Sequence, residues 1–218
     1  MSYQIAIDGP AGAGKSTIAK QIARQKGFIY VDTGALYRAM AYYLIAKGVK
    51  PEDEDAVALQ CQNADITICY ENDEQVVYLN GENINGLIRT EEVGNMASAT
   101  SKYPAVRKRL LVLQKDIAEK NNVVMDGRDI GTCVLPGADV KVYLTASAKV
   151  RAKRRYDELT AKGISCDMDQ IEADIVARDN QDMTREISPL KQAEDAVLLD
   201  SSAMNIEQVV QVILDLCK

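Results

Sequence analysis

A glycine-rich segment near the start of the chain has the residue types and spacing that bind a chain of phosphates. The pattern GxxxxGK(S/T) runs from Gly9 to Ser16, after an apolar run, Gln4 to Ile7, and before a helical run, Thr17 to Lys26. Such glycines let backbone N–H groups curve around a phosphate, the lysine neutralises the β and γ phosphates, and the serine hydroxyl binds magnesium. The sequence therefore predicts a nucleoside triphosphate site made of Gly9, Pro10, Ala11, Gly12, Ala13, Gly14, Lys15, Ser16 and Thr17.

Aspartate ends three of the short apolar runs, at Asp8, Asp32 and Asp126, and Asp200 follows a fourth. In an open α/β sheet the carboxyl ends of the strands form the ligand crevice, so these residues are candidates for the site. The alternative is that each aspartate starts a turn or caps the next helix. Asp126, after an apolar strand, is placed as a magnesium-binding carboxylate that acts together with Ser16.

Two sets of charged residues are spaced so that their side chains share a helical face: Arg151, Arg154 and Arg155 at i, i+3 and i+4, and Arg178, Asp182 and Arg185 at i, i+4 and i+7. One interpretation is a solvated helix face with weak ion pairs. The other is phosphate binding, because arginine forks bind phosphate oxygens bidentately and arginine predominates over lysine here.

The elements that must position these residues are expected to be βα repeats. Short apolar runs at 4–7, 28–31, 123–125, 140–144 and 197–199 are each followed by a turn and then a longer amphipathic stretch. Strands buried on both faces have this pattern, so the fold class is α/β, a P-loop NTP hydrolase-like parallel sheet flanked by helices. From about 64 to 84 the period becomes two, with turns at Glu71–Glu74 and Asn80–Gly81, which predicts a small antiparallel insert. Helical residues 90–103 follow it, and Pro104 opens another helix.

Composition excludes several classes of function. The 218 residues suit one domain, and a net charge of −6 argues against a nucleic-acid binder. The absence of histidine removes imidazole bases and His-containing zinc sites. Five scattered cysteines are typical of reduced thiols, with a buried disulfide as the alternative. With no signal peptide and no apolar run of membrane length, we expect a cytoplasmic protein that does not bind membranes.

Six segments together resemble the bacterial cytidylate kinase family of nucleoside monophosphate kinases. They are GPAGAGKST (9–17), VDTGALYR (31–38), IRTEEV (88–93), YPAVR (103–107), MDGRDIGT (125–132) and ARDNQDMTR (177–185). IRTEEV and DGRDIGT are specific to that family, whereas the phosphate loop is not. The resemblance covers nearly the whole chain and implies a single P-loop kinase domain, residues 1–218. It also implies a monophosphate-binding insert at about 62–102 and a mobile lid at about 151–168.

The resemblance also implies a role for individual residues. Thr33, Arg38 and Arg128 would hold the acceptor and its phosphate, although some relatives have serine at the first of these positions. Ser98, Arg107, Asp129 and Arg185 would recognise the cytosine ring, and Arg178 and Asp182 would bind the ribose region. Lys15, Arg128, Arg151, Arg154 and Arg155 would form the catalytic set, and Ser16 and Asp126 would hold Mg²⁺.

The activity expected from this resemblance is transfer of the γ-phosphoryl group of ATP to CMP, and to dCMP. The acceptor is an ionised phosphate, so no general base is needed, which agrees with the absence of histidine. Two alternatives stay open. One is a kinase for another small acceptor, such as UMP, AMP, shikimate or gluconate; the other is a regulatory module in which ATP acts as a signal. A monomer is expected because the family is mostly monomeric.

Overall fold

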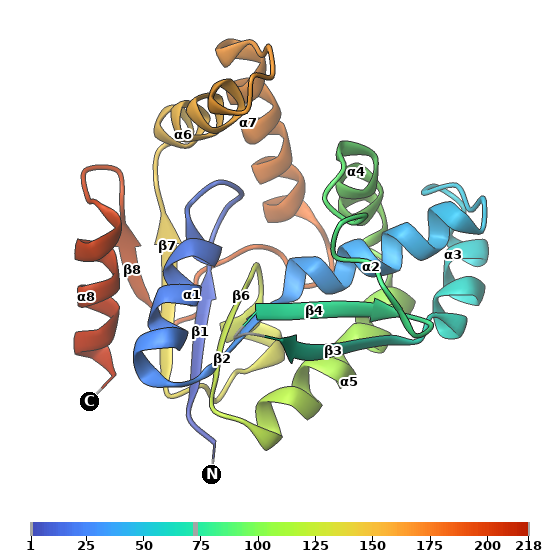
Figure 1. Cartoon of the computed structure of the whole chain (residues 1–218), viewed down its shortest axis with the longest axis horizontal. Helices are drawn as coiled ribbons and strands as arrows, with labels where there is room; N and C mark the ends of the chain where they lie inside the picture. The colour runs from blue at the N-terminus through green and yellow to red at the C-terminus, as the bar shows by residue number, and fades with distance from the viewer. Residues whose placement is uncertain (1, 72–73, 218) are drawn as a thin grey trace. The chain divides into compact units, whose positions relative to one another are not determined.

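The computed structural model describes residues 2–71 and 74–217, which divide into two compact units (Figure 1). The first unit contains Ser2 and residues 29–123, and the second contains residues 3–28 and 124–217. The predicted insert at about 62–102 falls within the first unit, and the predicted lid at about 151–168 falls within the second. That the whole chain acts as one kinase domain stays a prediction.

A five-stranded sheet has the strand order β2-β6-β1-β7-β8. Its strands are β1 (Gln4–Asp8), β2 (Ile29–Asp32), β6 (Val123–Gly127), β7 (Val140–Thr145) and β8 (Val197–Asp200). β1 pairs with β7, and β7 with β8, in parallel. The predicted α/β class is confirmed, and each strand ends one or two residues later than the apolar run that predicts it. The polar residues at the carboxyl ends continue the extended backbone although they end the apolar pattern.

The α-helices described in the second unit are α1 (Lys15–Lys26), α6 (Ala148–Ala161), α7 (Met168–Thr184) and α8 (Ile206–Leu216). α1 packs against α8, and α6 lies beside α7 (Figure 1). One prediction needs correction here, because α7 ends before Arg185, whose backbone is extended. Arg185 therefore does not continue the helical face that Arg178 and Asp182 share.

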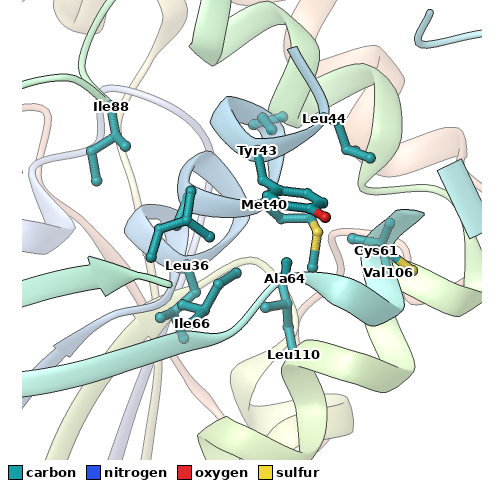
Figure 2. Packing of buried hydrophobic residues seen from close by; sticks show 14 of the residues in the cluster. Leu36, Met40, Tyr43, Leu44, Cys61, Ala64, Ile66, Ile88, Val106 and Leu110 are labelled. Atoms are coloured by element: carbon teal, nitrogen blue, oxygen red, sulfur yellow. The ribbon is translucent and has the colours of Figure 1, made fainter. Parts of the chain in front are cut away.

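The first unit is built on α2 (Thr33–Ala46), α3 (Glu54–Gln60), α4 (Glu91–Thr100) and α5 (Pro104–Lys120). Side chains from these helices and from the strand residue Ile66 form one buried hydrophobic cluster, part of which Figure 2 shows. The predicted helix start at Pro104 is confirmed, and the helix predicted over 90–103 is the shorter α4.

The predicted antiparallel insert is present as a three-stranded sheet, β3 (Ile66–Glu71), β4 (Glu74–Leu79) and β5 (Glu82–Asn83). Ile66 lies opposite Leu79 in the first pair of strands. The predicted turn at Asn80–Gly81 is confirmed, and both of its residues have positive φ. In the other predicted turn, residues 72 and 73 lie outside the described residues.

All five cysteines are free thiols, so the buried disulfide considered as an alternative is absent. Within residues 2–71 and 74–217, no helix combines the length and the apolar character needed to cross a membrane.

Candidate active site

The predicted phosphate loop joins β1 to α1 and is held close to β7. A Cβ atom built on Gly9 would lie 1.9 Å from the backbone oxygen of Leu144, and the φ angle of Gly9 is +150°. Only glycine fits this close approach of two backbones. Because α1 begins at Lys15, the unpaired N–H groups of its first turn lie at the end of the loop, where the helix dipole favours an anion.

Lys15 lies buried within this loop, and its Nζ donates to the backbone oxygen of Pro10 at 2.8 Å. Burial lowers the pKa of Lys15 to about 7, and the charge of Arg128 acts in the same direction. The carboxylates of Asp126 and Asp8 oppose this shift. A buried amine in such surroundings gains stability from a bound polyanion, because the phosphates favour its charged form.

Ser16 and Asp126 lie together at the start of α1 and the end of β6, as a magnesium site requires. The Ser16 Oγ donates to the Asp126 Oδ2 at 3.0 Å. Hydroxyl and carboxylate oxygens suit Mg²⁺, which takes few protein ligands and completes its shell with phosphate oxygens and water. Among the described residues, no group of three or more His, Cys, Asp or Glu side chains could hold a metal by itself. The residues therefore fit a metal that binds together with a nucleotide.

Four predicted acceptor residues of the second unit form a chain of alternating charge. The Arg128 Nε donates to the Asp182 Oδ2 at 2.8 Å. The other oxygen of Asp182 lies 3.7 Å from a terminal nitrogen of Arg185. The second terminal nitrogen of Arg185 lies 3.8 Å from the Asp129 Oδ1. This cluster offers two cationic forks for a phosphate and a buried carboxylate for a hydrogen-bond donor. Arg178, one helical turn before Asp182, is exposed.

In the first unit, the predicted residues Thr33 and Arg38 lie on the first turns of α2, after a carboxylate that pairs with Arg38. The Asp32 Oδ1 caps the helix by accepting from the N–H of Ala35 at 2.9 Å. The Asp32 Oδ2 lies 3.2 Å from terminal nitrogens of both Arg38 and Arg89. The Arg38 Nε is buried and has no hydrogen-bond partner among the described residues, so this fork can still accept an anion.

Ser98 and Arg107, predicted to recognise the base, come from the neighbouring helices α4 and α5. Ser98 is half-buried on α4, which packs against α2. The Arg107 guanidinium lies 5.8 Å from the centre of the Tyr37 ring and donates to the backbone oxygen of Ser101 at 3.2 Å. The first unit thus gathers its four predicted residues around the start of α2 and the helices packed against it.

The three arginines of α6 differ in their surroundings. Arg151 is 4% exposed, and its guanidinium donates to Ala146, Ala11 and Asp179. Arg154 donates to the backbone oxygen of Ser201 at 2.8 Å, whereas the exposed side chain of Arg155 pairs with Glu158 on its own helix. Arg155 is therefore the most easily redirected of the three.

These arginines and the phosphate loop line a pocket of about 740 Å³, which is large enough for a nucleotide. Its other wall comes from the segment between β8 and α8, including Ser201, Met204 and Asn205. Nothing in the sequence pattern singled out this segment.

Sequence reasoning missed three residues that hold the site together: Gln75, Arg89 and Asp179. Asp8 is a candidate because it ends a strand, but the sequence gives it no particular role, and Arg89 lies inside the IRTEEV segment without one. Gln75 and Asp179 had no detectable signal, because their partners Asp32 and Arg151 are distant in the sequence.

The parallel sheet with its flanking helices is a fold shared with solved kinase structures. The shikimate kinase of Bacteroides thetaiotaomicron aligns with a TM-score of 0.50 and 16% identity, over 99% of this chain and 98% of that one. Similarity at this level shows the fold alone.

A sequence model of the cytidylate kinase family matches residues 5–218. The chain is 49% identical to a cytidylate kinase of Exiguobacterium sp., over 97% of this chain and 95% of that protein. It is also 49% identical to a cytidylate kinase of Bacillus licheniformis, over 97% of this chain and 94% of that protein. The chain belongs to the cytidylate kinase family.

Proposed function

We propose that this protein transfers the γ-phosphoryl group of ATP to CMP, giving CDP and ADP, and that dCMP is a second acceptor. The observation that carries the proposal is the charge-alternating chain Arg128–Asp182–Arg185–Asp129, which ends in a buried carboxylate and shares its unit with the phosphate loop. Such a chain suits an acceptor with one anionic end and one hydrogen-bond donor. Membership of the cytidylate kinase family supports the same reaction.

ATP is the proposed occupant of the pocket along the phosphate loop. Lys15 and the first turn of α1 would bind its phosphates, and the wall around Met204 would contact the rest of the nucleotide. Ser16 and Asp126 would hold Mg²⁺, which supplies positive charge against the β and γ phosphate oxygens. Asp126→Asn is expected to raise the magnesium concentration needed for half-maximal rate while leaving the affinity for CMP alone unchanged.

The residues proposed for CMP are those that the family resemblance assigns to the acceptor. Thr33, Arg38 and Arg128 would hold its phosphate. Ser98, Arg107, Asp129 and Arg185 would contact cytosine, and Arg178 and Asp182 the ribose. A carboxylate at position 129 accepts from the exocyclic amino group of cytosine and repels the carbonyl of uracil, and polar mismatches of this kind discriminate strongly.

The protein's own task in the reaction is positioning and charge stabilisation. An oxygen of the CMP phosphate attacks the γ phosphorus, and the bond to the bridging β–γ oxygen breaks as ADP leaves. The attacking oxygen is already ionised, so no side chain must remove a proton. Lys15, Arg128 and the arginines of α6 would stabilise the charge on the moving group, and one such arginine is worth about 10³ to 10⁵ in rate. Closure of the segment at about 151–168 would keep water from acting as acceptor.

An acceptor panel tests the proposal. Purified protein with ATP and magnesium is given CMP, dCMP, UMP, AMP, shikimate or gluconate, with a no-acceptor control, and ADP formation is followed. Rapid turnover with CMP and dCMP and a silent control are expected. Equal rates with UMP would overturn the role of Asp129 in base recognition. Turnover only with shikimate or gluconate would replace the acceptor, and no product with any acceptor would favour the regulatory module.

We further propose that the protein acts as a monomer in the cytoplasm, without nucleic acid or membrane as partner. Sedimentation at working concentration, with and without nucleotides, is expected to give the mass of one chain. A dimeric mass would contradict this part of the proposal.

A further inference from the structure

A buried carboxylate outside the predicted site joins the end of β1 to the loop that carries two acceptor residues. Asp8 is 5% exposed, and its two oxygens accept from the backbone N–H groups of Ile130 and Gly131, both at 2.7 Å. These residues directly follow Arg128 and Asp129. The bonds cross more than 120 positions of sequence and attach to the loop where its functional side chains project.

The turn after Asp129 is capped from another strand and not by its own first residue. A π-helical turn, Ile130–Val134, begins there, and the side chain of Asp129 makes no capping hydrogen bond to it. An aspartate just before a helical turn ordinarily accepts from the N–H groups of that turn. Here Asp8 accepts from them instead, so the Asp129 carboxylate is directed toward Arg185 and not toward its own backbone.

The opposite side of this loop is held by Lys141 on β7. A Cβ atom on Gly131 would lie 3.2 Å from the Lys141 Cδ and 3.3 Å from the Asp8 Oδ2, so the loop backbone passes closely between the two side chains. The Lys141 Nζ pairs with the Asp195 Oδ2 at 2.7 Å, which fixes the lysine stem against the glycine. The loop thus has little room to shift without breaking one of these contacts.

A carboxylate at position 8 is unfavourable for stability, which points to a role in function. Burial raises the pKa of Asp8 to about 6, and the nearby Asp129 acts in the same direction, while the two N–H groups and Lys15 oppose it. Within residues 2–71 and 74–217, the neighbouring cations Arg128, Lys141 and Arg151 pair with Asp182, Asp195 and Asp179 and not with Asp8. Only an ionised carboxylate offers two acceptor oxygens to two N–H donors, whereas asparagine would present its amide N–H to one of them.

We propose that Asp8 is a positioning residue for acceptor recognition: it holds residues 128–131 so that Arg128 and Asp129 face the acceptor nucleotide. This inference rests on the proposed function, because it assigns these two side chains to the acceptor. It gives Asp8 a role different from that of the phosphate loop, which directly follows it in the sequence. The Asp8 charge also favours the charged form of Lys15, so a loss at Asp8 is expected to affect the acceptor more than ATP.

The test is Asp8→Asn in the full chain, measured by steady-state kinetics with CMP and with UMP at pH 7.5. Loss of one charge-assisted hydrogen bond is expected to raise KM for CMP about tenfold or more. The preference for CMP over UMP is expected to fall, and KM for ATP is expected to rise by a smaller factor than KM for CMP. Calorimetric titration of the variant with CMP, without ATP, is expected to show the same loss of affinity.

Asp139→Asn is the matched control. The exposed Asp139 carboxylate accepts from the N–H of Gln4 at 2.7 Å, and Gln4 lies at the other end of β1 from Asp8. It is expected to leave both KM values unchanged. Gly131→Ala provides a second route if Asp8→Asn does not fold, because it crowds the same contact without changing charge. It is expected to raise KM for CMP and to lower the preference over UMP.

The proposal is overturned if a folded Asp8→Asn or Gly131→Ala variant keeps the wild-type KM for CMP and the wild-type preference. It is also overturned if KM for ATP rises and KM for CMP does not, since Asp8 would then act on the phosphate loop. Failure of the proposed function has a different signature: the wild type itself would not use CMP. The same comparison is then made with whichever acceptor the wild type uses, and an unchanged KM for that acceptor overturns the proposal.

Discussion

The guanidinium of Arg151 donates to the Asp179 Oδ2 at 2.6 Å, and a second nitrogen of the same group donates to the backbone oxygen of Ala11 at 2.8 Å. A buried ion pair on α6 and α7 is thereby attached to the phosphate loop. The loop's shape depends on this pair, because the Ala11 carbonyl is held by the same planar group that Asp179 orients.

Asp179→Ala is expected to lower the free energy of unfolding by about 3 kcal/mol or more, because it leaves the buried Arg151 charge without its partner. KM for ATP is expected to rise as the phosphate loop loses its support. Urea unfolding and steady-state kinetics measure the two effects. Arg155→Ala is the comparison, since it removes only an exposed pair with Glu158 and should change stability by less than about 1 kcal/mol. Equal stability losses in the two variants would contradict the prediction.

Two glycines of the phosphate loop are expected to differ in their tolerance of alanine. Gly9→Ala places a methyl group against the Leu144 backbone oxygen, which cannot move aside, and is expected to lower the free energy of unfolding by several kcal/mol, on the order of 3 or more. Gly14 also has positive φ, but no atom lies within 4 Å of its added Cβ. Gly14→Ala is therefore expected to lose only about 1 to 2 kcal/mol from the left-handed backbone. Denaturant unfolding measures the loss of stability in both variants. A larger loss of unfolding free energy for Gly14→Ala would refute the steric argument.

Gln75 on β4 connects the insert to the start of the acceptor residues in the first unit. Its Oε1 accepts from the N–H of Asp32 at 2.8 Å, and Asp32 in turn pairs with Arg38. Gln75→Ala is expected to raise KM for CMP about three- to tenfold, as loss of one hydrogen bond predicts, without changing KM for ATP. Tyr78→Phe is the control, because it removes a hydrogen bond from the tyrosine hydroxyl to Glu71 on the same small sheet. It should leave both KM values unchanged. An unchanged KM for CMP in Gln75→Ala would separate the insert from acceptor binding.

The stability difference between the wild type and Asp8→Asn is expected to depend on pH. The folded-state pKa of Asp8 lies at about 6, above its usual value of 3.8, so its contribution to stability is fully present below about 3.8 and is lost as the pH rises through about 6. Ionisation of Asp8 lowers the free energy of unfolding by at most about 3 kcal/mol. The asparagine variant does not titrate and shows no such loss. Between pH 4.5 and pH 7, the free energy of unfolding of the wild type should therefore fall relative to that of the variant. Urea unfolding at the two pH values measures this, and a constant difference would contradict the buried titration.

Much of the fold follows from local pattern. The five apolar runs became the strands of the sheet, and period-two alternation over 64–84 became β3 to β5. Pro104 opened α5 as expected of proline at a first helical position. These features depend on neighbours within a few residues, which is the range over which hydrophobic period and turn chemistry act. The end of α7 was missed because nothing in the local sequence distinguishes Thr184 from Arg185 as the last helical residue.

The residue types that carry the chemistry can be predicted from the sequence alone: a phosphate loop with its lysine and serine, an aspartate after a buried strand, and arginines without any histidine. Tertiary structure decided which of these side chains are committed to one another. It directed Asp8 to the N–H groups of residues 130 and 131, and Arg151 to Asp179, and left Arg155 exposed. The physical reason is that a buried charge or N–H group must find a partner, and which partner lies within 3 Å depends on how distant segments pack and not on their spacing in the chain.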